Sequence, residues 1–345
     1  MKSWSVAAVI ASSILSAGII STRSEAQAPA SAYVWPTPTA ADLRLVRGAL
    51  DMDVHGDPDV AGPRSAQAPR GFDVLEIARR AKALGMRGFV LKQHYDQSAA
   101  LAYIARQEVP GVEVYGGVVQ NLIIGGLNPQ SVFHLAEVKG GWGRVVWFPT
   151  FDSEVNAKQR SAGGPPKPFV QVVAGGELVP AARDVIAAVK EARTRDTNAE
   201  LVLETGYVTP AEALAIVREA NRQGLTKIVV SHAATGSSAL SADQMQEAVK
   251  LGAMLEFASV STMGANPEFQ PAVYAGMIRK AGVDHVIMGS DFGQPGRPLP
   301  PDGLALFAGL MRGQGFTEQE LYRMMAENPA RVMGLGRLPA TTGSN

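Results

Sequence analysis

The segment TPAEALAIVREANRQGLTKIVVSH, residues 209–232, decides the fold because it contains one complete unit of a pattern that recurs along the chain. It opens with a capping threonine, a proline at the first helical position and a reciprocal glutamate, which together predict a helix start. Gly224 follows the helical stretch, at the position where a glycine commonly ends a helix. The apolar run after it predicts a strand buried on both faces, and this strand ends in Ser231-His232. The unit is therefore a helix, a glycine, a strand and a terminal polar residue.

The same unit recurs from about residue 48 onward. Strands that alternate with helices predict a parallel sheet with helices outside it, and eight of them favour a closed (β/α)8 barrel, the TIM barrel of the α/β class. A doubly wound open sheet is the alternative. Residues 46–345 are expected to form this single domain, because no low-complexity tract or domain boundary interrupts them. The predicted strands are Ala49–Val54, Gly88–Leu91, Val112–Val119, Arg144–Phe148, Leu201–Leu203, Lys227–Val230, Met254–Phe257 and His285–Met288.

Two regions break this rhythm. Residues 153–180 contain Gly163-Gly164-Pro165-Pro166 and then two short strand-like runs around Gly175-Gly176. They predict a loop and a small hairpin after the fourth strand, which would form a lid over the barrel mouth. Residues 29–45 are rich in proline and alanine and predict an irregular N-terminal arm.

Residues 1–28 have the features of a secretory signal peptide. Lys2 precedes an apolar run from Val6 to Ile20, and small residues suited to signal peptidase follow it. The apolar run has about 15 residues, fewer than the roughly 20 that span a bilayer, although an uncleaved anchor is the rival interpretation. We therefore expect cleavage and an exported protein, periplasmic or secreted, with no membrane contact after cleavage.

Composition limits the partners and the ligands. Removing residues 1–28 leaves 30 basic and 31 acidic residues, so the chain lacks the basic surface that a nucleic-acid partner requires. There is no cysteine, so any metal must be held by nitrogen and oxygen atoms. We expect a small-molecule substrate as the partner, and a homo-oligomer is compatible with the sequence.

Polar residues concentrate at the predicted C-terminal ends of the strands. In a (β/α)8 barrel all eight of these ends meet at one mouth, where catalytic residues lie. Three of the five histidines occupy such ends, whereas His134 lies inside a predicted helix and His285 begins a strand, so both are expected to be structural. The strand-end residues singled out are Asp53, His55, Lys92, His94, Asn121, Glu204, Tyr207, His232 and Asp291.

Imidazoles and carboxylates in this set predict a divalent-metal site. Asp53 and His55 are two residues apart, so on a regular strand both side chains point to the same side. With His232 and Asp291 they form the expected ligand shell, and Glu204 is a further candidate ligand. Zinc suits these atoms, and manganese or iron would also be accepted. Asp51 is expected to support a neighbouring group from outside this shell.

The remaining strand-end residues suggest catalytic and binding roles. Asp291 could take a proton from water and pass it to a leaving group. His94 is a further ligand or polarises the substrate carbonyl, while Asn121 and Tyr207 shape the substrate pocket. Lys92 either binds a substrate carboxylate, pairs with a nearby aspartate, or bridges two metals in carbamylated form.

These residues resemble the amidohydrolase superfamily of metal-dependent hydrolases on a (β/α)8 barrel. His55, His232 and Asp291 match the superfamily's histidine and aspartate positions, and the closing segment Asn328–Leu335 is also similar. The resemblance extends from Leu50 to Leu335. It is nearest to an uncharacterised branch with segments like Leu91–Tyr95, Gly125–Pro129 and Gly289–Gln294. The resemblance implies that a metal-activated water attacks an amide, lactone, ester or related bond.

The sequence departs from the superfamily pattern at several positions. Asp53 replaces the first histidine of the pair after strand one, and Tyr207 stands in the region of the histidine after strand five. No lysine ends strand four, and the candidate lysine, Lys92, lies on strand two. Fewer neutral ligands favour one metal ion over two.

Two other functions remain open from the sequence. The first is a metal-free lyase or aldolase in which Lys92 forms a Schiff base. The second is a periplasmic small-molecule-binding protein whose catalytic site has decayed. The fold alone does not identify the substrate, because one scaffold hosts many reactions.

Overall fold

The computed structural model describes residues 33–61, 69–161, 164–165 and 167–336. The predicted signal peptide and the first residues of the predicted arm lie outside these ranges. The fold described below is that of the unit from Trp35 onward. Within the described ranges, no helix combines the length and the apolar character needed to cross a bilayer.

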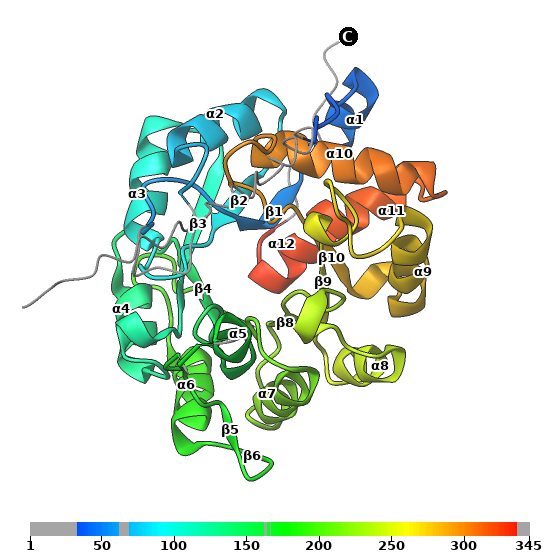
Figure 1. The fold of residues 1–345 in the computed structure, drawn as a ribbon. Helices are drawn as coiled ribbons and strands as arrows, with labels where there is room; N and C mark the ends of the chain where they lie inside the picture. Colours follow the sequence, from blue (N-terminus) through cyan, green and yellow to red (C-terminus); the bar gives the residue numbers. More distant parts are fainter. Residues whose placement is uncertain (1–32, 62–68, 162–163, 166, 337–345) are drawn as a thin grey trace, which may run out of the picture. The chain divides into compact units, whose positions relative to one another are not determined.

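Eight parallel strands form one sheet in strictly sequential order, which confirms the predicted barrel (Figure 1). The first and last strands meet, because Asp291 N donates to Asp53 O at 2.9 Å and His55 N donates to Phe292 O at 2.9 Å. A doubly wound sheet would place later strands on both sides of the first, so that alternative is wrong. The strands are β1 (Leu50–Val54), β2 (Gly88–Leu91), β3 (Glu113–Val119), β4 (Gly143–Trp147), β7 (Val202–Glu204), β8 (Ile228–Val230), β9 (Met254–Ala258) and β10 (Val286–Gly289).

Helices surround the barrel. The capping box predicted at Thr209 is present, and Ser241 and Thr317 begin their helices with the same motif. The C-terminal helix packs against the inner barrel core, since Val332 and Met333 belong to the same buried cluster as Leu50 and Trp147. Residues from all eight strands of the barrel contribute to this core, which fills the barrel interior. The helices are α1 (Ala40–Leu45), α2 (Val74–Ala83), α3 (Ala99–Glu108), α4 (Pro129–Glu137), α5 (Glu154–Arg160), α6 (Pro180–Glu191), α7 (Pro210–Arg222), α8 (Ala242–Lys250), α9 (Pro271–Ala281), α10 (Pro300–Gly313), α11 (Glu318–Tyr322) and α12 (Asn328–Met333).

Two regions differ from the sequence prediction. The last residues of the predicted irregular arm form the helix α1. This helix begins with a capping box between Thr39 and Asp42. The region predicted as a loop with a lid contains α5, whose first turn is capped by Ser153. The predicted hairpin exists as β5 (Val173–Ala174) and β6 (Glu177–Leu178), but Figure 1 shows it at the periphery beside α6 and α7. Of the two elements, α5 and not the hairpin contributes to the mouth.

Candidate active site

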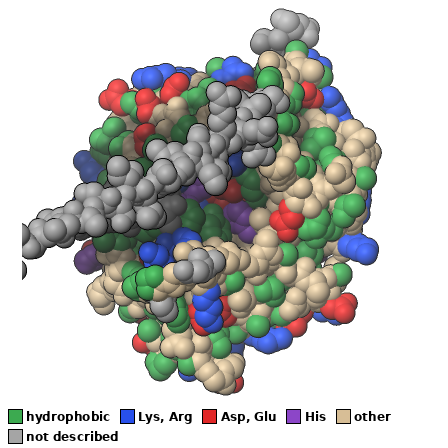
Figure 2. All heavy atoms as spheres, viewed as in Figure 1, with side chains coloured by type: hydrophobic (Ala, Val, Ile, Leu, Met, Phe, Trp, Pro, Cys, Tyr) green, Lys and Arg blue, Asp and Glu red, His purple; other side chains and the backbone are tan. Residues whose placement is uncertain are grey.

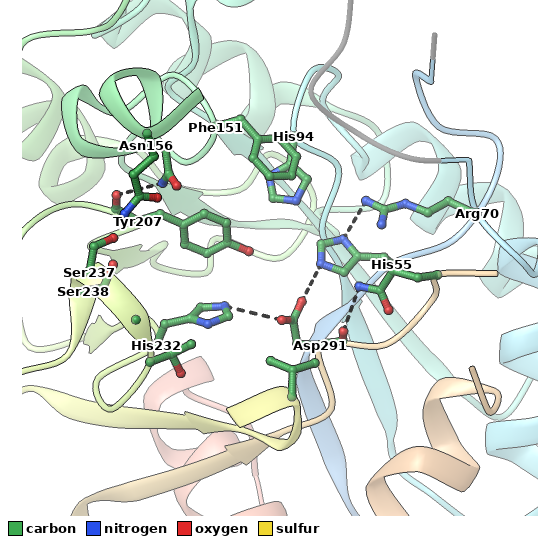
Figure 3. Close-up of a pocket in the computed structure, with 15 residues that line it drawn as sticks. His55, Arg70, His94, Phe151, Asn156, Tyr207, His232, Ser237, Ser238 and Asp291 are labelled. Atoms are coloured by element: carbon green, nitrogen blue, oxygen red, sulfur yellow. Dashed lines mark hydrogen bonds and ion pairs between the residues drawn. The ribbon is translucent and has the colours of Figure 1, made fainter. Parts of the chain in front are cut away.

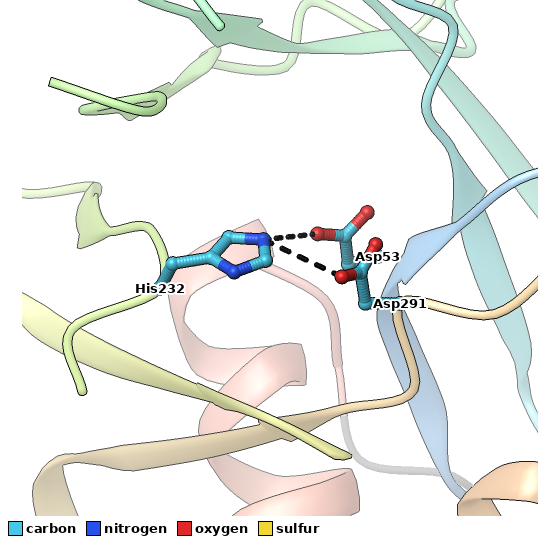
Figure 4. A group of neighbouring side chains, drawn as sticks. All are labelled: Asp53, His232 and Asp291. Atoms are coloured by element: carbon cyan, nitrogen blue, oxygen red, sulfur yellow. Dashed lines mark hydrogen bonds and ion pairs between the residues drawn. The ribbon is translucent and has the colours of Figure 1, made fainter. Parts of the chain in front are cut away.

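Three buried side chains from three different strand ends converge at the barrel mouth. Asp53 lies on β1, His232 follows β8 and Asp291 follows β10 (Figure 4). Their potential ligand atoms all lie within 4.8 Å of one another. His232 Nε2 is 3.2 Å from Asp53 Oδ2 and 4.0 Å from Asp291 Oδ2. The group has the chemistry and the compactness of a site for one cation.

His55 joins this group from the end of β1. Its Nε2 lies 3.0 Å from Asp291 Oδ1 and 3.4 Å from Asp53 Oδ1. Its Nδ1 lies 2.8 Å from the carbonyl oxygen of Lys92, the kind of outer contact that orients a metal-binding imidazole. The four residues predicted as the metal shell are therefore neighbours in space.

The backbone is strained at two of the four residues. His232 and Asp291 have φ values of 50° and 53°, a left-handed conformation that is uncommon outside glycine and costs roughly 1–3 kcal/mol. Hydrogen bonds hold both turns: His232 N donates to Glu256 Oε2 at 3.2 Å, and Asp291 N donates to Asp53 O at 2.9 Å. These two turns are where the chain leaves β8 and β10 at the mouth.

Asp53 is the electrostatic centre of the site. Burial alone would raise its pKa, but Lys92, His232 and His55 together hold it well below the usual range. Lys92 Nζ donates to Asp53 Oδ2 at 2.8 Å, and neither side chain is appreciably exposed. Asp53 Oδ1 accepts no hydrogen bond within the described part of the chain. Asp53 Oδ2 is thus hydrogen-bonded to Lys92, and Asp53 Oδ1 faces His55.

Lys92 is an ion-paired ammonium. Burial opposes its charge, but Asp53 and further acidic neighbours raise its pKa well above the usual value. It also donates to Tyr207 Oη at 3.1 Å and lies 4.6 Å from the centre of that ring. This ion pair agrees with the predicted pairing to a nearby aspartate. A Schiff base needs a neutral amine, so this environment gives the lyase alternative no support.

Asp291 and His94 have contrasting protonation states. Burial and the charge of Asp53 raise the pKa of Asp291, but the hydrogen bond with His55 and the charges of His232 and His55 lower it below its usual value overall. Burial, followed by the positive charges of His55 and Lys92, lowers the pKa of His94 well below the usual value. His94 Nδ1 is 2.8 Å from Thr150 Oγ1, and its ring stacks on His55 with centroids 5.0 Å apart. At neutral pH the site therefore contains an ionised Asp291 and a neutral His94.

Three further carboxyl groups are buried close to the cluster. Glu204, predicted as a metal ligand, accepts hydrogen bonds from Trp147 Nε1 at 2.8 Å and Ser231 Oγ at 3.0 Å, and it is not part of the compact group. Burial raises its pKa to about 7. Asp51 has the supporting position predicted for it, because its Oδ1 accepts hydrogen bonds from the backbone of Asp53 and Ser290, and burial raises its pKa to about 7. Glu256 was not predicted, and burial raises its pKa well above the usual value.

A pocket of about 510 Å³ is lined by three of the four residues, His55, His232 and Asp291. Figure 2 shows histidine and acidic side chains at the floor of a hollow, and Figure 3 shows the Tyr207 phenol pointing into it. Asn156 and Gln159 of α5 line one wall, and the turn after β8 lines the adjoining wall. Asn121, predicted to shape the pocket, is not among the described lining residues: its side-chain amide donates to the His94 carbonyl and Thr150 Oγ1 and accepts from Thr150 N, so it positions those groups. The other lining residues are His55, Arg70, His94, Phe151, Tyr207, His232, Thr235, Gly236, Ser237, Ser238, Val260, Asp291 and Gln294.

Sequence reasoning missed Arg70. This residue lies in the long connection after β1, between a segment rich in proline and alanine and α2, where no periodic pattern marks it. Its Nε donates to Asp59 Oδ2 at 2.9 Å, and its Nη2 lies 3.0 Å from His55 Nδ1. Its contact with His55, 15 residues earlier in the chain, places it at the pocket.

Comparison with known proteins places the chain in a family. Residues 48–256 match a family described as a family of unknown function, DUF6282. The chain belongs to DUF6282. The match runs from β1 into β9 and includes Asp53, His55 and His232, whereas Asp291 lies beyond it. No curated protein matches this DUF6282 chain.

Solved structures similar to this DUF6282 protein share its barrel. A lactonase from Listeria monocytogenes has a TM-score of 0.57 at 14% identity, with 86% of this chain and 97% of that chain covered. An organophosphorus hydrolase from Deinococcus radiodurans has a TM-score of 0.55 at 15% identity, with 87% and 99% covered. An amidohydrolase from Pseudomonas aeruginosa has a TM-score of 0.52 at 11% identity, with 85% and 97% covered. At these identities the likeness concerns the fold, and it agrees with the amidohydrolase resemblance seen in the sequence.

Proposed function

We propose that this DUF6282 protein is a metal-dependent hydrolase of the amidohydrolase type. The observation that carries the proposal is the buried convergence of Asp53, His232 and Asp291, with His55 Nε2 against both carboxylates. Its substrate would be a small molecule with an amide, lactone, ester or related bond. The names of the similar structures, a lactonase and an organophosphorus hydrolase among them, support hydrolysis as the reaction type.

The residues present fit one divalent cation. Asp53 Oδ1 is buried and accepts no hydrogen bond from the described residues. A bound cation would give this oxygen a partner. Two carboxylates and two imidazoles are the donors that zinc, manganese or iron accept when thiolates are missing. Asp53, His55, His232 and Asp291 would hold the ion. It would supply Lewis acidity and make hydroxide available near neutral pH.

The chain's own groups would manage the protons and orient the substrate. Asp291 is ionised, so its carboxylate can accept a proton from the attacking water and return it to the leaving group. Burial raises the pKa of Tyr207 well above its usual value, so its phenol stays protonated and can donate to a developing negative charge. Lys92 acts indirectly, since its ammonium fixes both Tyr207 and Asp53. His94 is neutral and faces the pocket, where it can polarise a carbonyl.

The test measures metal content and hydrolysis on the same samples. We expect close to one equivalent of zinc, manganese or iron by elemental analysis, and activity against at least one member of a panel of lactones, N-acyl amino acids and phosphotriesters. The double variant H232N/D291N should lose both metal and activity. H94F should keep the metal and lose about 10²–10⁴-fold in kcat, as expected when a group that assists proton transfer or polarises the carbonyl is removed.

The matched control is H134N, because His134 is an exposed histidine of α4 outside the pocket. It should retain metal and activity. Full hydrolysis by chelator-treated protein, or unchanged metal content in H232N/D291N, would contradict the proposal. Tight retention of a small molecule without metal or turnover would instead support the decayed binding protein.

We also propose that the protein acts after export, in the periplasm or outside the cell. The support is the leader-like segment at residues 1–28. N-terminal sequencing of the protein from its native cells should find a mature chain that starts near residue 27 or 29, and an intact Met1 on the folded protein would argue against it.

A further inference from the structure

Arg70 is the one lysine or arginine among the described residues that line the pocket. Its side chain is only 4% exposed, and its Nε forms an ion pair at 2.9 Å with the fully buried side chain of Asp59. The backbone beside it is also fixed, since Gly71 N donates to Gly293 O at 2.8 Å. A cationic, five-donor group is therefore held rigidly at the edge of the pocket, next to the proposed metal shell (Figure 3).

The contact of Arg70 with His55 cannot persist once His55 binds a cation. His55 Nδ1 lies 2.8 Å from the Lys92 carbonyl oxygen and 3.0 Å from Arg70 Nη2. The ring nitrogen must carry its proton to donate to the carbonyl, and it must lack the proton to accept from Arg70. A ring that offers Nε2 to a metal carries its proton on Nδ1, so it donates to the carbonyl. Arg70 Nη2 then loses the ring nitrogen as an acceptor and needs another.

The lining of the pocket also leaves room for an anion. Asp291 is the one acidic residue among the described residues that line the pocket, and it is a proposed ligand whose carboxylate would face the cation. Arg70 adds donors at the edge of the pocket, while the wall opposite carries uncharged groups of α5 and of the turn after β8. These uncharged residues are Asn156, Gln159, Thr235, Ser237 and Ser238. A negatively charged group next to the proposed metal site would give Arg70 Nη2 the acceptor that it needs.

We propose that the substrate carries a carboxylate or phosphate group close to the bond that is cleaved, and that Arg70 binds this anion through its guanidinium. This inference rests on the proposed function and narrows its substrate class. Arginine suits the role because its planar fork matches both carboxylate and phosphate oxygens. Asp59 orients the guanidinium through Nε and leaves the two Nη groups for other partners.

The experiment titrates zinc-loaded protein with three probes by calorimetry at pH 7. Monomethyl glutarate is a carboxylate, methyl phosphate is a phosphate, and dimethyl glutarate is the neutral match of the first. We expect at least one anion to bind at least tenfold more tightly than the neutral ester. R70Q should weaken that anion at least tenfold and leave the neutral ester unchanged, because it removes charge-assisted hydrogen bonds.

Two further variants keep the test decisive. R70K keeps a positive charge beside Asp59 but lacks the planar guanidinium. It should therefore fold like the wild type and bind the anion several-fold more weakly. R218Q removes one positive charge from an exposed site on α7 that pairs with Glu247, and it should bind the anion like the wild type. Thermal melting of each variant checks that the fold is intact.

The two proposals fail separately. Zinc content measured on the same samples reports the proposed metal site, whatever the probes do. Anion binding that is unchanged in both R70Q and R70K, equal binding of the neutral ester, or no anion binding to folded, zinc-loaded protein would each overturn the assignment of Arg70.

Discussion

Replacing Lys92 with methionine tests whether the ion pair with Asp53 organises the barrel mouth. The 2.8 Å separation corresponds to about 6 kcal/mol of Coulomb attraction at an effective dielectric constant near 20. Methionine keeps most of the apolar stem, so the variant mainly leaves a buried carboxylate without its cation. Removing one partner of a buried pair costs about 3–5 kcal/mol, which is a large part of a typical stability of about 5–15 kcal/mol.

The assay is urea unfolding of chelator-treated K92M and wild type at pH 7, followed by circular dichroism. Chelation matters because a bound ion would stabilise the two proteins unequally. The double variant D53N/K92M removes both charges, so it should regain at least half of the stability that K92M loses. The reasoning is refuted if K92M unfolds within about 1 kcal/mol of wild type, or if the double variant is no more stable than K92M.

Two further predictions concern buried groups near the site. Burial raises the pKa of Glu204 from 4.5 to about 7, so its contribution to stability is present at low pH and is lost as pH rises through 7. E204Q should therefore lose less stability than wild type between pH 5 and pH 8, by roughly 2–3 kcal/mol in urea unfolding of metal-free protein, and parallel pH profiles would contradict this. Gly293 has a φ of 140°, and a Cβ there would lie 2.1 Å from the His55 carbonyl oxygen, so G293A should destabilise the protein by at least about 3 kcal/mol and reduce its zinc content. The control is Gly296, which has a φ of 76° and no atom within 4 Å of such a Cβ. G296A should therefore lower the stability by only about 1–2 kcal/mol and keep the zinc. Equal losses of stability in the two variants would show that the contact with His55 does not matter.

The amino-acid sequence was sufficient for the elements and their order. Capping boxes, helix-ending glycines and buried apolar runs are local signals, because they depend on hydrogen bonds and burial within a few residues. All eight strands lie where these signals predict them, and no strand end differs from its predicted position by more than one residue. A polar residue after a parallel strand must lie at the mouth, so the convergence of His55, His232 and Asp291 also followed from the sequence once a barrel was assumed.

The tertiary structure alone decided which polar groups touch. The pairing of β1 with β2 shifts register between Asp51 and Val54, so strict alternation does not describe this strand end. Lys92 bonds to Asp53, and Asn121 bonds to the His94 carbonyl. These contacts depend on distances across the barrel, which the spacing of residues in the sequence does not specify. The contact of Arg70 with His55, 15 residues apart in the sequence, is likewise seen only in the folded chain. Local patterns specify where a strand begins and ends, whereas partner choice among buried charges is settled by packing in three dimensions.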